Sequence, residues 1–467
     1  MSRQLRIRIV GLLVVLLSGV VAVGIVVPAC GFEAPNLVDT PSDAPMALFD
    51  SPPDVFIPDA APCSSLIKTC VSGTVLRACQ TVGQLPAETT CEWDCSEIPE
   101  PHCRVLMPSG GAVTSQDLDP AMAMSAGLQK RTFTSITQPG SINTDTGAIQ
   151  IGFDSRQSGT GVRNGIDFKV VNGVGIFRAL ELEFKGIQTV RVTGSNALAL
   201  VGIDKIHIGD GTQFDLRGSC TGRTAGPGGK QGGAGDGDGS GTGAGGAGDN
   251  TGVCSGGGGA GNSEPGGPGG GRTNGGGTAG NATITMLTGG AGGGGGGTGG
   301  EGGGGGGAIQ LVSNGPITLN GTLGTVGINA GGCGGKGGPC GGGAGAGGAI
   351  LIEGRTVDFG NAYLAANGGG GGGAANGSSG EQAQTTNRAN GGNGSTPIGP
   401  NNDGGDGGDG GDDGSSAAGG TVRDGRGGGG GGGVGWIRIT TKSGSTGGSV
   451  FMTPDPPSAS TGTANVQ

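Results

Sequence analysis

Long glycine tracts are the feature that most limits what this chain can fold into. Of its 467 residues 120 are glycine, and they concentrate in three tracts, at roughly 218–307, 327–347 and 368–433. Glycine has no side chain to bury and loses more backbone freedom on ordering than any other residue. Because ordering one residue costs on the order of 1 kcal/mol or more, the burial that drives folding must come from other segments.

Short apolar stretches recur between these tracts in a fixed order. ALALV, KIHI and QFDLRG follow one another from Ala197, AIQLV, PITL and GTLGTVG from Ala308, and AILIE, TVDF and AYLAANG from Ala349. WIRITT and GSVFM begin a further set at Trp436. Each stretch alternates apolar and other residues, as β-strands do, and Gly, Asn or Asp turns separate them. The recurrence predicts an all-β fold, a parallel β-helix with three strands per coil. A β-sandwich with long loops is the alternative.

This β-helix implies both a register and a place for the glycine tracts. Every tract follows the third strand of a coil, so the tracts should leave as inserts at one corner and lie side by side. They are then either disordered linkers or extended threads with three residues per turn, joined by backbone hydrogen bonds. The expected inward ladders are Leu198–Ile309–Ile350, Leu200–Leu311–Ile352, Ile206–Ile317–Val357, Ile208–Leu319–Phe359, and Phe214 or Leu216 with Leu323 and Leu364.

The N-terminal segment predicts export. Three arginines precede an apolar run at 9–27, which indicates a signal peptide or a membrane anchor within residues 1–29. The sequence VPAC, ending at Cys30, resembles the lipobox of bacterial lipoproteins, and this resemblance implies a lipid on Cys30. Prolines make residues 30–62 an extended tether. We expect lipid anchoring at the outer membrane or cell surface, with an inner-membrane anchor through 9–27 or plain secretion as alternatives.

Ten further cysteines fit an oxidising compartment. Residues 63–103 are too few to bury a sufficient core, so three disulfides are expected to define this module. In the glycine tracts, Cys220 with Cys254 and Cys333 with Cys340 would pin the chain. The expected disulfide residues are Cys63, Cys70, Cys79, Cys91, Cys95, Cys103, Cys220, Cys254, Cys333 and Cys340.

Two resemblances accompany this organisation. The run CEWDCSEIPEPHC followed by MPSGG resembles Cys-rich modules in surface lipoproteins of myxobacteria, and the glycine runs resemble PE-PGRS-type repeats. The rest of the chain divides into a β-rich capping region at 104–165, the β-helix with its inserts at 166–455, and a disordered tail at 456–467.

Few residues suit catalysis or metal binding. The chain has two histidines and one tyrosine, which nearly excludes Ser-His-Asp triads and His-rich metal sites. Period-three spacing would align four aspartates as one ridge on an extended thread, either a Ca²⁺ site or a solvated acidic edge. These weak calcium candidates are Asp403, Asp406, Asp409 and Asp412.

An enzyme would place its groups on the outer face of the β-helix. His207, Thr318 and Asp358 should form an outward column there. Carboxylates and basic residues on the first coil could serve glycoside chemistry, namely Asp204, Lys205, Asp210, Asp215 and Arg217. The net charge of −10 argues against nucleic-acid binding. We expect no cofactor and a structural or adhesive role against an envelope or matrix polysaccharide, with a β-helix polysaccharide lyase or glycoside hydrolase as the alternative.

Overall fold

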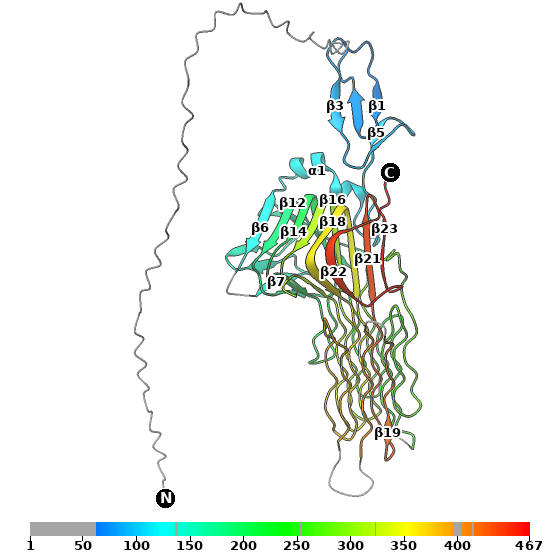
Figure 1. The fold of residues 1–467 in the computed structure, drawn as a ribbon. Coiled ribbons are helices and arrows are strands. Elements are labelled where there is room, and N and C mark those ends of the chain that lie inside the picture. Colours follow the sequence, from blue (N-terminus) through cyan, green and yellow to red (C-terminus); the bar gives the residue numbers. More distant parts are fainter. Residues whose placement is uncertain (1–61, 136–138, 253, 323, 396–402, 413–414) are drawn as a thin grey trace, which may run out of the picture. The chain divides into compact units, whose positions relative to one another are not determined.

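The computed structural model describes residues 62–467, except 136–138, 253, 323, 396–402 and 413–414 (Figure 1). The expected leader, the lipidation residue Cys30 and the tether up to residue 61 therefore lie outside the described residues. In the described part of the chain, no helix has the length and apolar character needed to cross a bilayer. The regular structure there is almost entirely strand, with one short 3₁₀ helix, η1 (Ser115–Leu118), and one α-helix, α1 (Pro120–Ser125).

Residues 63–103 form a small module that disulfides hold together. Its antiparallel strands are β1 (Lys68–Ser72), β2 (Val75–Ala78), β3 (Ala87–Thr90), β4 (Cys95–Ser96) and β5 (His102–Cys103). None of these strands contains a fully buried residue, so side-chain burial contributes little to them. All six cysteines pair, as Cys63–Cys79, Cys70–Cys95 and Cys91–Cys103.

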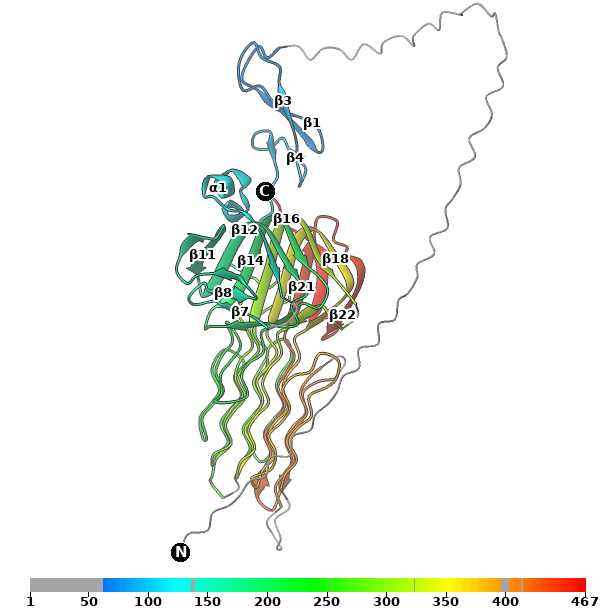
Figure 2. The same cartoon turned by 90° about the vertical axis from the view of Figure 1, so that its left-hand side faces the viewer.

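A single 16-stranded sheet contains two parallel runs of strands. The first run contains β6 (Lys130–Thr134), β12 (Val174–Lys185), β14 (Ala197–Ile208), β16 (Ala308–Asn320), β18 (Ala349–Ala365), β21 (Trp436–Thr441) and β23 (Ala459–Thr463). The second contains β7 (Gly140–Asn143), β13 (Val190–Thr193), β15 (Gln213–Asp215), β17 (Gly327–Asn329), the end of β18, and β22 (Gly447–Thr453). Because β18 belongs to both runs, the sheet curls into a nearly closed, barrel-like wall (Figures 1 and 2).

Antiparallel strands complete the two ends of this sheet. One end adds β10 (Gly161–Arg163) and β11 (Ile166–Val171), and the other adds β8 (Ile149–Ile151) and β9 (Asp154–Arg156). The all-β class is thus confirmed. The first two strands predicted for each coil are one continuous strand, as in β16, whose pairing with β18 shifts register between Ser313 and Pro316.

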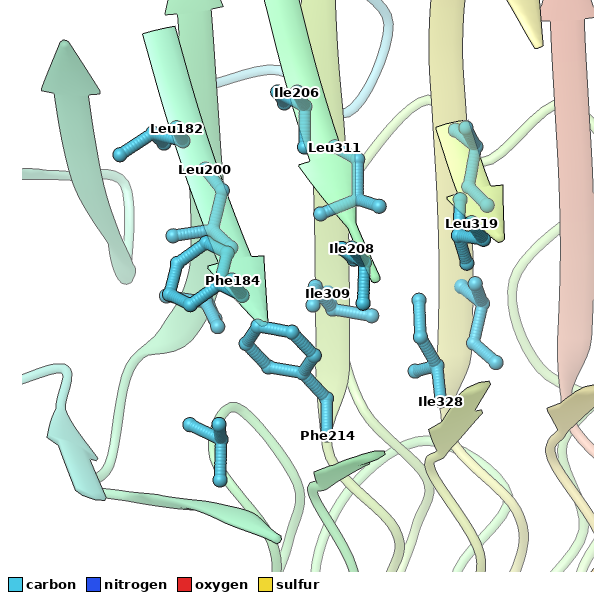
Figure 3. Close-up of a cluster of buried hydrophobic side chains, with 14 of the residues drawn as sticks. Leu182, Phe184, Leu200, Ile206, Ile208, Phe214, Ile309, Leu311, Leu319 and Ile328 are labelled. Atoms are coloured by element: carbon cyan, nitrogen blue, oxygen red, sulfur yellow. The ribbon is translucent and has the colours of Figure 1, made fainter. Parts of the chain in front are cut away.

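The predicted register of the inward ladders is largely confirmed. Leu198–Ile309–Ile350, Leu200–Leu311–Ile352, Ile206–Ile317–Val357 and Ile208–Leu319–Phe359 are aligned across neighbouring strands. All twelve side chains are buried in one core, and several are drawn in Figure 3. The fifth ladder is wrong at its middle position, because Ile328 of β17, and not Leu323, lies between Phe214 and Leu364.

Two predicted boundaries are also wrong. The tail at 456–467 is ordered: β23 pairs with β21, and the backbone N–H of Val105 donates to Gln467 O at 3.0 Å. The second glycine insert begins at residue 330, because residues 327–329 form β17. The three inserts, at 216–307, 330–348 and 366–435, follow β15, β17 and β18, which are hydrogen-bonded neighbours. They therefore leave the sheet side by side, as predicted.

These three inserts, which we call the glycine bundle, run beside one another as extended threads (Figures 1 and 2). Along residues 256–261, successive N–H groups donate to three different neighbouring threads, and the same neighbour returns every third residue. The donor–acceptor pairs, all at 2.8 or 2.9 Å, are Gly256–Gly270 and Gly259–Gly267, then Gly257–Gly341 and Ala260–Ala344, then Gly258–Gly246 and Gly261–Gly243. A three-residue period is that of the extended polyproline-type helix.

The threads run in both directions because each insert must return to the sheet. The thread at 341–344 runs parallel to residues 256–261, whereas the threads at 267–270 and 243–246 run antiparallel to them, as the order of the bonded pairs shows.

The cysteine pairing expected within single tracts is wrong. The bridges are Cys220–Cys333 and Cys254–Cys340, and both join the first insert to the second.

Candidate functional site

The outward column around His207 forms as predicted, and Glu183 of β12 extends it. His207 pairs with Thr318 and Thr318 with Asp358, while Nδ1 of His207 lies 2.6 Å from Oγ1 of Thr318. Burial, and then the nearby charge of Lys205, lowers the pKa of His207. The backbones of neighbouring parallel strands lie ~4.8 Å apart. Glu183 and Asp358 lie three strands apart in the column, so their backbones are separated by about 14 Å. Paired glycosidase carboxylates are only ~5–9.5 Å apart.

The other predicted residues of the first coil do not gather into one site. Burial raises the pKa of Asp204, which lines a separate cavity beside the Cys-rich module. Oδ1 of Asp210 accepts a hydrogen bond from the backbone N–H of Thr322 at 2.7 Å, which fixes a turn. Only Asp215 and Arg217 meet, in a cleft described below.

The predicted acidic ridge is an edge of the glycine bundle. Oδ1 of Asp406 accepts from the N–H of Gly394, and Oδ1 of Asp409 from that of Gly391, both at 2.8 Å. The three-residue spacing of the aspartates therefore matches that of the donors on the neighbouring thread. Among the residues that the structure describes, no cluster of three or more His, Cys, Asp or Glu side chains could hold a metal ion. Asp406 and Asp409 attach one thread to the next, whereas Oδ1 of Asp412 is buried without a hydrogen-bond partner in the described residues.

A cleft of ≈ 460 Å³ opens beside the second run of strands, and we call it the Tyr363 cleft. Four strands contribute to its wall: β15, β17, β18 and β22. The third glycine insert supplies the segment 384–386 on the other side. The lining residues are Thr189, Gln213, Phe214, Asp215, Arg217, Gly324, Asn329, Tyr363, Gln384, Thr385, Thr386 and Phe451.

Asp215 and Arg217 are the charged side chains among the lining residues of the Tyr363 cleft, and Asp215 also pairs with Arg191 outside that lining. Oδ1 of Asp215 lies 2.9 Å from Nε of Arg217 and its Oδ2 lies 2.8 Å from Nη1 of Arg191. Burial acts to raise the pKa of Asp215, but hydrogen bonds and charge from Arg217, together with the charge of Arg191, outweigh it and lower that pKa. Asp215 is therefore ionised at neutral pH, and the three side chains carry a net charge of one positive unit.

Two nearly buried polar side chains line the same cleft without full hydrogen bonding. Asn329 is 5% exposed, and its Oδ1 accepts from the N–H of Gly331 at 3.0 Å, whereas its Nδ2 has no partner in the described chain. Tyr363 is 7% exposed, and its hydroxyl has no partner there either; burial raises its pKa to about 12. Phe451, 38% exposed, adds an aromatic surface. Convergent polar groups with an apolar wall are typical of ligand sites.

Sequence reasoning reached Asp215 and Arg217 but missed the rest of this cleft. Tyr363 is the only tyrosine of the chain, and this was the one sequence feature that could have marked it as a candidate site residue. No protein-family model matches the chain, and comparisons with curated proteins and with solved structures find no significant match. The geometry of the chain itself is therefore the basis for a functional assignment.

Glu353 is a separate buried carboxyl whose protonation is expected to make folding stability depend on pH. Glu353 lies on the outward face of β18, 1% exposed, and accepts hydrogen bonds from the N–H of Ser109 at 3.0 Å and from Nε2 of Gln310 at 2.7 Å. Burial raises its pKa above the ordinary value of 4.5, although these hydrogen bonds oppose the rise. A raised pKa means that the folded state retains a proton that the unfolded state has already lost.

We expect the stability contributed by protonated Glu353 to be complete below pH 4.5 and to be lost as pH rises through its folded pKa. Glu353→Gln removes this titration. The difference in Tm between Glu353→Gln and the wild type should therefore grow in favour of the variant as the pH rises above about 4.5. Thermal unfolding at several pH values measures it, with the exposed Glu100→Gln as control. A pH-independent difference for Glu353→Gln would contradict the assignment.

Proposed function

We propose that this chain is an exported structural or adhesive protein of the cell surface, in which a parallel β-helix holds a rigid glycine bundle. The observation that carries this proposal is the period-three backbone hydrogen bonding of the inserts. A lattice of this kind commits the described residues of three long segments to backbone contacts with one another. Such an element suits a scaffold that projects from a surface or contacts a polymer.

The β-helix itself is inferred from the two runs of parallel ladders. In this interpretation one coil passes from β14 through a turn to β15, and the next from β16 to β17. β18 would hold all three strands of a third coil in one element, since its first part pairs with β16 and its last residues with β17. The barrel-like curl of the sheet supports this interpretation.

Export and anchoring rest on two independent features. The five disulfides fit an oxidising compartment. The VPAC sequence favours lipid attachment at Cys30, which would tether the protein to the outer membrane or cell surface through residues 30–62. The expected partner beyond the membrane lipid is an envelope or matrix polysaccharide.

The proposal is tested on the full chain expressed in a Gram-negative host. We expect mass spectrometry to find a mature N-terminus at Cys30 carrying lipid, and Cys30→Ala to move the protein from the membrane fraction to the soluble fraction. Hydrogen exchange should find protected amides along 256–261 and 341–346. An unmodified N-terminus would refute lipid anchoring, and exchange of these amides at the rate of an unfolded chain would refute the rigid bundle.

A further inference from the structure

We infer that the Tyr363 cleft binds an acidic sugar residue, a uronate, of the polysaccharide that this protein contacts. The inference rests on the proposed surface role, because it names the ligand class that such a protein would meet. The cleft volume of ≈ 460 Å³ lies within the ~300–1,000 Å³ typical of small-molecule sites and accommodates one or two pyranose rings.

The guanidinium group of Arg217 favours a sugar that carries a carboxylate. Arg217 uses Nε and Nη2 on Asp215, and its Nη1 makes no hydrogen bond within the described chain. Asp215 is shared between Arg217, which lines the cleft, and Arg191, which lies outside that lining, so one carboxylate serves two guanidinium groups. Guanidinium groups recognise carboxylates through charge-assisted hydrogen bonds. A uronate carboxylate supplies such a partner, whereas a neutral hexose does not.

The unpartnered donors suit the hydroxyl groups of a sugar. Nδ2 of Asn329 and the hydroxyl of Tyr363 belong to side chains that are at least nine-tenths buried, and neither atom has a partner in the described residues. Both atoms remain accessible to solvent although their side chains are nearly buried, so each can donate to water or to a polar ligand in the cleft. The exposed ring of Phe451 offers an apolar surface to the C–H groups of a pyranose face.

The same geometry favours binding over cleavage. Among the described residues that line the cleft, Asp215 is the one carboxylate, and glycoside hydrolysis ordinarily uses a pair. Because burial raises the pKa of Tyr363 to about 12, its hydroxyl stays protonated at neutral pH and acts as a donor. The cleft therefore holds a sugar residue without an acid–base pair to break its glycosidic bond.

Saturation-transfer NMR with the full mature chain tests the inference. The probes are galacturonate and glucuronate, with galactose and glucose as their neutral counterparts. We expect transfer to at least one uronate, at least tenfold weaker binding of the neutral sugar, and loss of uronate binding in 0.5 M salt, because screening weakens the arginine–carboxylate attraction. Arg217→Gln should weaken uronate binding at least tenfold. The matched control is Arg272→Gln, an exposed arginine with no ion pair among the described residues.

A second variant separates loss of the site from loss of the fold. Phe451→Ala changes an exposed ring and should weaken binding at least fivefold while the Tm stays within about 2 °C of wild type. Equal binding of neutral and acidic sugars would overturn the carboxylate recognition. Absence of binding by all four sugars, or uronate binding that Arg217→Gln and Phe451→Ala leave unchanged, would overturn the cleft assignment. Lipid at Cys30 and protected bundle amides would in that case still support the proposed function.

Discussion

Gly343→Ala is expected to loosen the packing of the glycine bundle and to lower the stability of the whole chain. A Cβ at residue 343 would overlap the carbonyl oxygen and carbon of Gly258 on the neighbouring thread. The N–H of Gly343 is bonded to Gly294 O at 2.8 Å and its carbonyl accepts from Gly303 at 2.8 Å, so the residue is held on two further sides. Two backbones must move apart, and overpacking of this kind costs about 1–3 kcal/mol, sometimes more.

Hydrogen exchange and thermal unfolding measure this effect. In Gly343→Ala, amides along 256–261 and 341–346 should lose protection first, since these threads are direct neighbours. Gly277→Ala is the matched control, because a Cβ there meets no atom within 4 Å and the residue is exposed. It should be neutral or stabilise by up to about 1 kcal/mol through the unfolded chain. Equal behaviour of Gly343→Ala and Gly277→Ala would contradict close packing of the threads.

The register of the sheet was predictable because one alternation pattern returns in each set of strands. A slip by one residue would turn Leu200 and Leu311 outward, so burial leaves a single alignment. The third strand is harder, because it is only three residues long in β15 and β17. Two apolar residues, Leu323 and Ile328, fit that ladder position equally well by alternation, and the sequence pattern alone does not select Ile328.

Contacts among the glycine threads and in the Tyr363 cleft were not predictable, for a common reason. Both sets of contacts depend on which distant segments become neighbours. In the glycine threads no pattern of apolar and polar side chains indicates which segments pair. The bridge Cys254–Cys340 closes 86 residues, whereas the expected pairing of Cys333 with Cys340 closes only seven. In the cleft, Asn329, Tyr363 and Phe451 come from three different strands. The side-by-side exit of the inserts was predictable from their place after the third strand, and the three-residue period of the aspartates matched the geometry of the bundle.

Arg156→Lys should produce the largest loss of stability outside the bundle. Arg156 is 1% exposed, and no carboxylate of the described residues pairs with it. Its guanidinium lies over the ring of Phe168, 5.4 Å from the centroid. Burial, with the charge of Arg163 as a second cause, lowers its pKa. Its N–H groups instead donate to five backbone carbonyls, those of Gly147, Gln157, Gly159, Gly161 and Ile166, at 2.6–3.1 Å.

An ammonium has three donors on one atom and cannot reach five carbonyls placed for a planar fork. Arg156→Lys therefore leaves buried acceptors unsatisfied at about 1–3 kcal/mol each, and we expect a total loss of at least about 3 kcal/mol. Denaturant unfolding measures the loss, and hydrogen exchange should locate it in residues 147–166. The control is Arg163→Lys, which changes an exposed arginine on the neighbouring strand β10 and should cost under about 0.5 kcal/mol. If the two substitutions cost the same, the five carbonyl contacts do not stabilise this end of the sheet.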